Sequence, residues 1–157
     1  MAEEKTNVMR VLDQKKISYT PHYYPTDGAI DGVSVAAMLG QDPARTFKTL
    51  VTVGASKKNY VFVIPVAAEL DLKAAARAVG EKSIAMLKQA QLLPLTGYVH
   101  GGCSPIGMKK LLRTVIDQSA EGQEAIMVSA GRVGAQVELS PADLAGLVRA
   151  EFAPVTV

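Results

Sequence analysis

Thr46-Phe-Lys-Thr-Leu-Val-Thr-Val53 and the later stretch Tyr60-Val-Phe-Val-Ile-Pro65 form the centre of the predicted fold. Both stretches are rich in β-branched and aromatic residues, which favour strands. Residues 56–59 between them are polar, so we expect the two strands to pair as a hairpin. Side chains alternate along a strand, which places Phe47, Thr49 and Val51 on one face and Lys48, Leu50 and Thr52 on the other.

Working outward from this hairpin, the sequence predicts alternating short helices and strands. Before it we expect a helix capped by Thr6 or Asn7, a strand over 17–24 and a helix over 33–39 that ends at Gly40. After it we expect a helix over 72–79, a second helical stretch from about Lys82 to Leu93, strands over 112–116, 125–129 and 136–139, and a last helix that follows Ser140 and Pro141 and runs through Arg149. The fold class is therefore a mixed α/β (α+β) fold, with a mixed, mostly antiparallel sheet or partial barrel flanked by helices. Residues 1–157 are interpreted as a single domain.

Composition limits the classes of protein and their partners. Nearly half of the 157 residues are hydrophobic, a fifth are charged and the net charge is +2, so an aliphatic core is expected and a strongly basic nucleic-acid binder is not favoured. A single cysteine, a polar beginning and no long apolar run predict a cytoplasmic protein without a membrane segment. His22, His100 and Cys103 do not form a ligand-spaced cluster, so no metal and no cofactor are expected.

The segment Thr96-Gly-Tyr-Val-His-Gly-Gly-Cys-Ser-Pro-Ile-Gly107 has the highest density of turn-forming residues. Glycines allow a backbone to approach a ligand closely and to present N–H donors, although such a loop can also do no more than turn a corner. A phosphate-binding P-loop is excluded because Met108 stands where that motif requires lysine. A cysteine nucleophile at Cys103 with His100 as base is a further alternative, and a small packed residue is the simpler interpretation.

Two polar residues stand out within apolar strands. Lys48 is flanked by Phe47 and Leu50; a lysine in a strand usually lies on a solvated edge, but one that faced a cavity would need an anion or a developing oxyanion. Ser129 ends the predicted strand Ile126-Met-Val-Ser, where an ordinary turn residue is also common. No Gly-x-Ser-x-Gly motif surrounds it, so a serine hydrolase triad is not supported.

Taken in order, these segments resemble the YbaK/EbsC family, within the superfamily that includes the editing domain of prolyl-tRNA synthetase. The resemblance covers essentially the whole chain and rests on Phe47-Lys-Thr-Leu50, Leu70-Asp-Leu72, Thr96-Gly-Tyr98, Gly101-Gly-x-Ser-Pro-x-Gly107-x-Lys-Lys and Val128-Ser129 followed by Gly131. The segment 25–32 departs from the family pattern, and Ala130 and Arg132-Val133 replace more familiar residues.

The resemblance implies a trans-editing deacylase that removes cysteine from mischarged Cys-tRNA(Pro). It implies that the thiol of the bound cysteine attacks its own ester, so that the protein supplies orientation and oxyanion stabilisation. The family's site carries over to catalytic positions Lys48 and Gly101 and to substrate-binding positions Tyr24, Ile30, Thr49, Gly102 and Ser129. Tyr23 could be the equivalent in place of Tyr24, and Ile30 is the candidate for a family phenylalanine.

Mischarged tRNA is the implied partner, and prolyl-tRNA synthetase is a second candidate partner. Two other interpretations stay open at this point. One is a deacylase for another small amino acid, such as Ala-tRNA(Pro), in which water attacks the ester. The other is an inactive module that binds tRNA or a synthetase, against which Lys48 and the complete glycine loop argue.

Overall fold

The computed structural model describes residues 5–26 and 31–157. Within these residues the chain forms five α-helices and two open β-sheets, so the mixed α/β prediction is confirmed and the sheets do not close into a barrel. The helices are α1 (Asn7–Gln14), α2 (Gly32–Met38), α3 (Leu72–Val79), α4 (Gln89–Thr96) and α5 (Pro141–Val148). The strands are β1 (Thr20–Tyr23), β2 (Phe47–Gly54), β3 (Asn59–Pro65), β4 (Ile84–Met86), β5 (Arg113–Asp117), β6 (Ile126–Ser129), β7 (Ala135–Leu139) and β8 (Glu151–Ala153), with a 3₁₀ turn at Gln118–Gly122.

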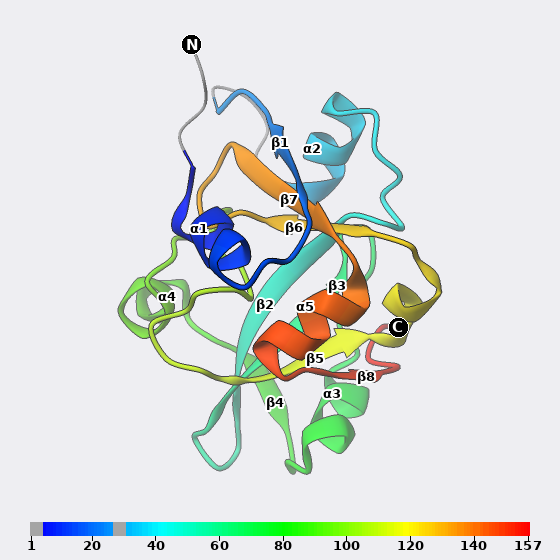
Figure 1. Cartoon of the computed structure of the whole chain (residues 1–157). Coiled ribbons are helices and arrows are strands. Elements are labelled where there is room, and N and C mark those ends of the chain that lie inside the picture. Colours follow the sequence, from blue (N-terminus) through cyan, green and yellow to red (C-terminus); the bar gives the residue numbers. More distant parts are fainter. Residues whose placement is uncertain (1–4, 27–30) are drawn as a thin grey trace.

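The larger sheet has the strand order β4-β2-β3-β5-β8 and is built on the predicted hairpin. Strands β2 and β3 pair antiparallel, with Leu50 opposite Phe62, and β5 and then β8 add in parallel. The smaller sheet has the order β1-β7-β6 and is antiparallel throughout. Figure 1 shows β6 and β7 crossing over β2 near its first residues, where Thr46 forms a bridge with Met127.

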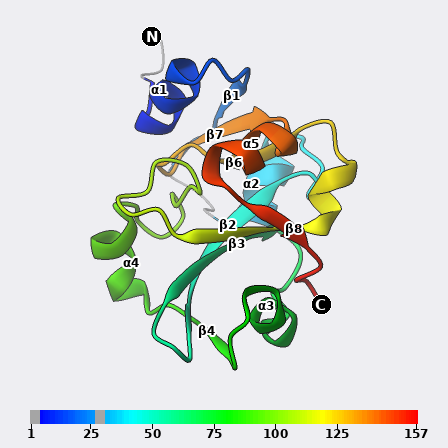
Figure 2. The ribbon, with the colours of Figure 1, turned by 60° about the horizontal axis from the view of Figure 1, so that its bottom comes forward.

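Two hydrophobic clusters hold these layers together. The first lies between the two sheets and includes α1 and α5, with Phe47, Val51 and Val128 among its buried residues. The second lies between the larger sheet and α3, with Phe62 at its centre. Figure 2 shows α3 on one side of the larger sheet and the smaller sheet with α1 on the other. Phe47 and Val51 belong to the first cluster and Leu50 packs against the second, as the alternation along β2 predicts.

Local capping signals explain where several helices begin and end. Thr6 caps α1 by accepting a hydrogen bond from the Met9 amide, and Ser140 caps α5 by accepting one from the Asp143 amide. Helix α3 ends at Gly80, whose φ of 74° is in the left-handed region that glycine enters without strain. These boundaries confirm the sequence-based predictions for the three helices.

The helix predicted from Lys82 to Leu93 is wrong. Residues 84–86 form β4, which pairs with β2 at Thr52–Gly54, and α4 begins only at Gln89 and continues past Pro94 to Thr96. The helical spacing of apolar residues is overridden because the edge of β2 offers backbone partners there. Strand β1 is also shorter than predicted, and β8 was not predicted.

In the described part of the chain, no helix combines the length and apolar character that crossing a membrane requires. The single-domain organisation of residues 1–157 stays a prediction.

Phe62 tests the dependence of the fold on the central hairpin. Its side chain is fully buried, so Phe62→Ala is expected to lower the free energy of unfolding by about 3–5 kcal/mol through lost burial and a cavity. Urea unfolding followed by circular dichroism measures the change. Leu111→Ala is the control, because this side chain is 65% exposed and its loss should change the free energy by less than about 0.5 kcal/mol. Equal effects of the two variants would contradict the assignment of Phe62 to the core.

Candidate functional site

A cavity of about 500 Å³ lies beside β2. Its wall is contributed by segments far apart in the sequence: α2, β2, the β4–α4 junction, the glycine loop, and the ends of β6 and β7. Five of the predicted site residues line it, namely Tyr24, Lys48, Thr49, Gly101 and Ser129. Ile30 lies outside the described residues. The cavity therefore gathers most of the residues that the motifs singled out.

The open edge of β2 creates this cavity. On one side β2 pairs with β3 along its length, while on the other side β4 reaches only Thr52–Gly54. At the opposite end the bridge between Thr46 and Met127 attaches the smaller sheet. Among the described strands, none pairs with the outer edge of residues 47–51. The cavity occupies the gap that these two attachments leave.

Thr49 presents both backbone and side-chain groups along this gap. The Val66 amide, which follows β3, donates to the carbonyl of the even-numbered residue Thr46 on the β3 side. The Leu87 amide donates to the carbonyl of the odd-numbered residue Val51 on the opposite side. Backbone polar groups alternate between the two edges of a strand, so the odd-numbered residues of β2 direct theirs to the outer edge. The Thr49 hydroxyl oxygen is buried and forms no hydrogen bond with the described residues. A buried hydroxyl without a partner is costly, and a ligand in the cavity would supply that partner.

Lys48 is half-buried and is the only lysine or arginine among the described residues of the cavity wall. It stands opposite Ile64 in the hairpin. Within residues 5–26 and 31–157 it forms no ion pair with an acidic side chain. Its charge is therefore not neutralised by these residues, which suits a position beside an anionic or oxyanionic group.

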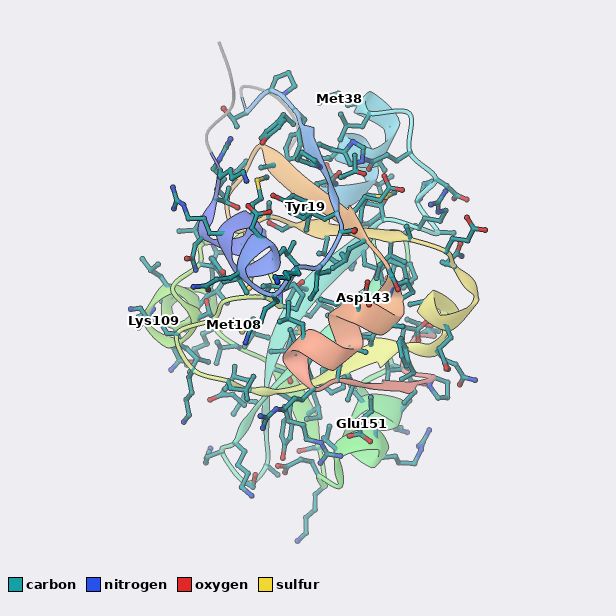
Figure 3. All side chains as sticks on the ribbon, viewed as in Figure 1. Tyr19, Met38, Met108, Lys109, Asp143 and Glu151 are labelled. Carbon is teal, nitrogen blue, oxygen red and sulfur yellow. The ribbon has the colours of Figure 1, made fainter. Side chains whose placement is uncertain are left out.

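The glycine loop approaches the cavity with Gly101, whose φ of 88° lies in the left-handed region. Gly102, predicted to bind substrate, is not among the described residues of the wall, and its role stays a prediction. A Cβ atom there would lie 2.9 Å from the Val133 amide nitrogen, so the loop backbone packs directly on the β6–β7 turn. The far end of the loop is held where the Lys109 amide donates to the carbonyl of Thr96, and Figure 3 shows Lys109 beside α4.

The two neighbouring tyrosines, Tyr23 and Tyr24, lie in different surroundings. Tyr24 lines the cavity, and its amide donates to the Gly134 carbonyl. The Tyr23 hydroxyl instead contacts the sulfur of Met9, and the Tyr23 ring lies under the Arg132 guanidinium. Ser129 lines the cavity at the end of β6, where its hydroxyl accepts a hydrogen bond from the Gly131 amide. The geometry therefore favours Tyr24 over Tyr23 as the cavity residue.

Asp31 and Gln136 line the cavity but were missed as site residues from the sequence. Gln136 is buried in β7, and its side-chain carbonyl accepts a hydrogen bond from the Gln41 amide group at 2.8 Å. In the sequence Gln136 is a polar residue between the apolar residues Ala135 and Val137, just as Lys48 is a polar residue in an apolar strand. This pattern could have identified Gln136 as a candidate site residue. Asp31 immediately precedes a short helix, where aspartate is common as an N-cap, so its position alone does not indicate a site.

Cys103 lines the cavity as a buried, neutral thiol. Burial raises its pKa to about 12, because a thiolate is poorly solvated there. His100 is exposed, and no hydrogen bond joins it to Cys103 among the described residues. The arrangement lacks the adjacent base and the lowered pKa that a cysteine nucleophile requires.

The raised pKa of Cys103 predicts slow alkylation. Because the thiolate is the reactive form, the native protein at pH 8 should react with iodoacetamide at least about a hundredfold more slowly than the urea-unfolded chain. The thiolate population grows only as the pH rises toward 12. Mass spectrometry gives the rate without ambiguity, since the chain has one cysteine. Comparable rates in the native and unfolded states would show that Cys103 is accessible and ionisable.

Across residues 5–26 and 31–157, no group of three or more histidine, cysteine, aspartate or glutamate side chains is placed to hold a metal ion.

Comparisons with known proteins identify the family of this chain. The model of the aminoacyl-tRNA editing domain family matches residues 29–147. A protein of Enterococcus faecalis, EbsC, proposed to be a Cys-tRNA(Pro)/Cys-tRNA(Cys) deacylase, is 44% identical over 155 residues, which cover 98% of this chain and 94% of EbsC.

Two crystal structures show the same fold at 22% sequence identity. A proposed trans-editing enzyme for prolyl-tRNA synthetase has a TM-score of 0.83, covering 98% of this chain and 99% of its own. A hypothetical protein has a TM-score of 0.87, covering 96% and 99% respectively. The predicted family and the predicted class of enzyme, an aminoacyl-tRNA deacylase, are confirmed. This chain belongs to the aminoacyl-tRNA editing domain family.

Proposed function

We propose that this protein removes cysteine from mischarged Cys-tRNA(Pro), and that the substrate's own thiol cleaves the ester. The terminal adenosine and its aminoacyl group would enter the cavity beside β2. Lys48 and the backbone near Gly101 would stabilise developing negative charge, while Tyr24, Thr49 and Ser129 would position the substrate. A contact with prolyl-tRNA synthetase, which would present the tRNA, belongs to the same proposal.

The observation that carries this proposal is the chemical character of the cavity wall. Among the described residues it holds one lysine without an ion-pair partner, a threonine hydroxyl without a hydrogen-bond partner and a glycine loop, and its only thiol is neutral. Such a wall can orient an ester and stabilise an oxyanion without contributing a nucleophile. The nucleophile would then come from the substrate. The name of EbsC, which is 44% identical to this chain, describes cysteinyl-tRNA substrates.

The proposed reaction balances without a co-reactant. The cysteine thiol loses its proton and its sulfur attacks the ester carbonyl carbon, forming a carbon–sulfur bond. The tetrahedral oxyanion collapses and the bond between that carbon and the ribose oxygen breaks. The ribose oxygen takes up a proton, so the products are a cysteine thiolactone and tRNA with a free terminal hydroxyl. Proximity of the tethered thiol supplies much of the acceleration.

Lys48→Ala is expected to lower kcat/KM for Cys-tRNA(Pro) by about a hundredfold or more, because a cation beside the developing oxyanion is removed. Deacylation of radiolabelled Cys-tRNA(Pro) measures this effect, and circular dichroism checks the fold. Lys58→Ala is the matched control, since Lys58 is exposed in the turn between β2 and β3 and should leave the rate unchanged. Near-normal turnover by Lys48→Ala would remove Lys48 from the site.

The identity of the amino acid tests the mechanism. Ser-tRNA(Pro) is expected to be deacylated far more slowly than Cys-tRNA(Pro), by more than the roughly 10- to 200-fold that size selection alone provides, because a thiol is a better nucleophile than a hydroxyl. Rates and products are measured for both substrates and for Ala-tRNA(Pro) in ¹⁸O-labelled water, with mass spectrometry to identify a thiolactone. Rapid cleavage of Ala-tRNA(Pro), or free cysteine carrying ¹⁸O from the first turnover without any thiolactone, would establish water as the nucleophile.

A further inference from the structure

The cavity wall carries two opposite charges that are not paired with each other. Lys48 is its only lysine or arginine and Asp31 is its only acid among the described residues. No ion pair joins these two side chains, and neither forms an ion pair with another described residue. Opposite charges in one cavity ordinarily attract and pair, so their separation leaves each of them available to a different part of a ligand.

The carboxylate of Asp31 is held in place but is not saturated. One oxygen accepts from the Ser34 amide at 2.9 Å and the other from the Ser34 hydroxyl at 2.8 Å. Each carboxylate oxygen can accept a further hydrogen bond. The hydrogen bond from the Ser34 amide also lowers the pKa of Asp31, so the group is an anion at neutral pH. Two bonds from one serine fix its orientation at the cavity rim.

The aminoacyl end of a charged tRNA offers a matching pattern of charge. Its α-amino group is positively charged when protonated; a peptide α-amino group has a pKa of about 8, and the electron-withdrawing ester lowers this pKa toward neutrality. Its phosphates and the oxyanion that forms at the ester are negative. A site that holds one fixed cation and one fixed anion apart can bind both ends of this pattern.

We propose that Asp31 binds the α-ammonium group of the aminoacyl ester, and so favours substrates whose α-amino group is free. This inference rests on the proposed function, because it requires an aminoacyl ester in this cavity. Asp31 then acts as a specificity-determining residue: an N-acylated amino acid, as in peptidyl- or formylated tRNA, loses the cation and leaves the carboxylate unpaired.

A capping role alone does not account for the charge. Asn and Ser cap helices about as well as Asp, and Thr6 and Ser140 cap α1 and α5 in this chain without a charge. Asp71 is also a capping aspartate, which accepts hydrogen bonds from the amides of Lys73 and Ala74 at the start of α3, but it does not line the cavity. Asp71 therefore supplies a matched control in which a capping aspartate is changed away from the cavity.

The experiment compares Cys-tRNA(Pro) with N-acetyl-Cys-tRNA(Pro) for the wild type, Asp31→Asn and Asp71→Asn. Asparagine keeps the cap and removes only the charge. Asp31→Asn is expected to lower kcat/KM for the free amine about fivefold, as for loss of a partly exposed ion pair. It should leave the acetylated substrate within about twofold of the wild type. Asp71→Asn should change neither substrate selectively.

The ratio of kcat/KM for Cys-tRNA(Pro) to kcat/KM for N-acetyl-Cys-tRNA(Pro), compared between variant and wild type, decides the outcome. This comparison cancels any general effect of the mutation or of acetylation. An equal loss on both substrates would mean that Asp31 acts only through α2, and no loss on either would mean that it does not touch the substrate; each result overturns the inference. If the wild type fails to deacylate Cys-tRNA(Pro) at all, the proposed function itself is wrong and this inference falls with it. If the wild type deacylates Cys-tRNA(Pro) but Asp31→Asn does not change the kcat/KM ratio, only the role of Asp31 is refuted and the proposed function stands.

Discussion

The unequal pairing of the two edges of β2 is the constraint on which the rest of this structure depends. One edge is paired with β3 over the whole strand, while the strands and bridges of residues 5–26 and 31–157 pair with the other edge only at its two ends. An exposed strand edge invites aggregation, and proteins usually cover it with a helix or loop. Here α2, α4 and the glycine loop surround the open segment at a distance that leaves a cavity of about 500 Å³. Under the proposed function, this open segment of the strand edge would line the substrate-binding site.

The packing on both faces of the larger sheet keeps this edge in position. The first hydrophobic cluster fixes β2 against the smaller sheet, and the second fixes its partner β3 against α3. Because both faces are buried, β2 cannot slip in register without moving apolar side chains to the wrong side. Lys48 and Thr49 are therefore held by the core, although their polar groups serve the cavity. Gly102 extends this rigidity to the loop, since its backbone packs on the β6–β7 turn.

The electrostatics of the cavity suit a substrate that brings its own nucleophile. The cysteine of the wall is neutral because burial disfavours its thiolate, whereas Lys48 and Asp31 keep charges that no described side chain neutralises. Under the proposed function, the protein's contribution would be a fixed arrangement of charges and donors around a flexible ester. Preorganised polar groups of this kind stabilise charge as it develops without reorganising.

The sequence by itself determined the β2–β3 hairpin, the caps at Thr6 and Ser140, and the motif residues Lys48, Thr49, Gly101 and Ser129, because each depends on local patterns or on short motifs. It failed at residues 82–93, where pairing of β4 with β2 outweighed helical spacing. The substrate-binding role of Gly102 stays a prediction, and the backbone of this glycine packs on the β6–β7 turn. Only the tertiary structure decided that Asp31, Gln136 and Tyr24 share one cavity. The physical reason is that this cavity is a gap between strand pairings, and which edge of β2 stays open is fixed by contacts between residues far apart in the chain.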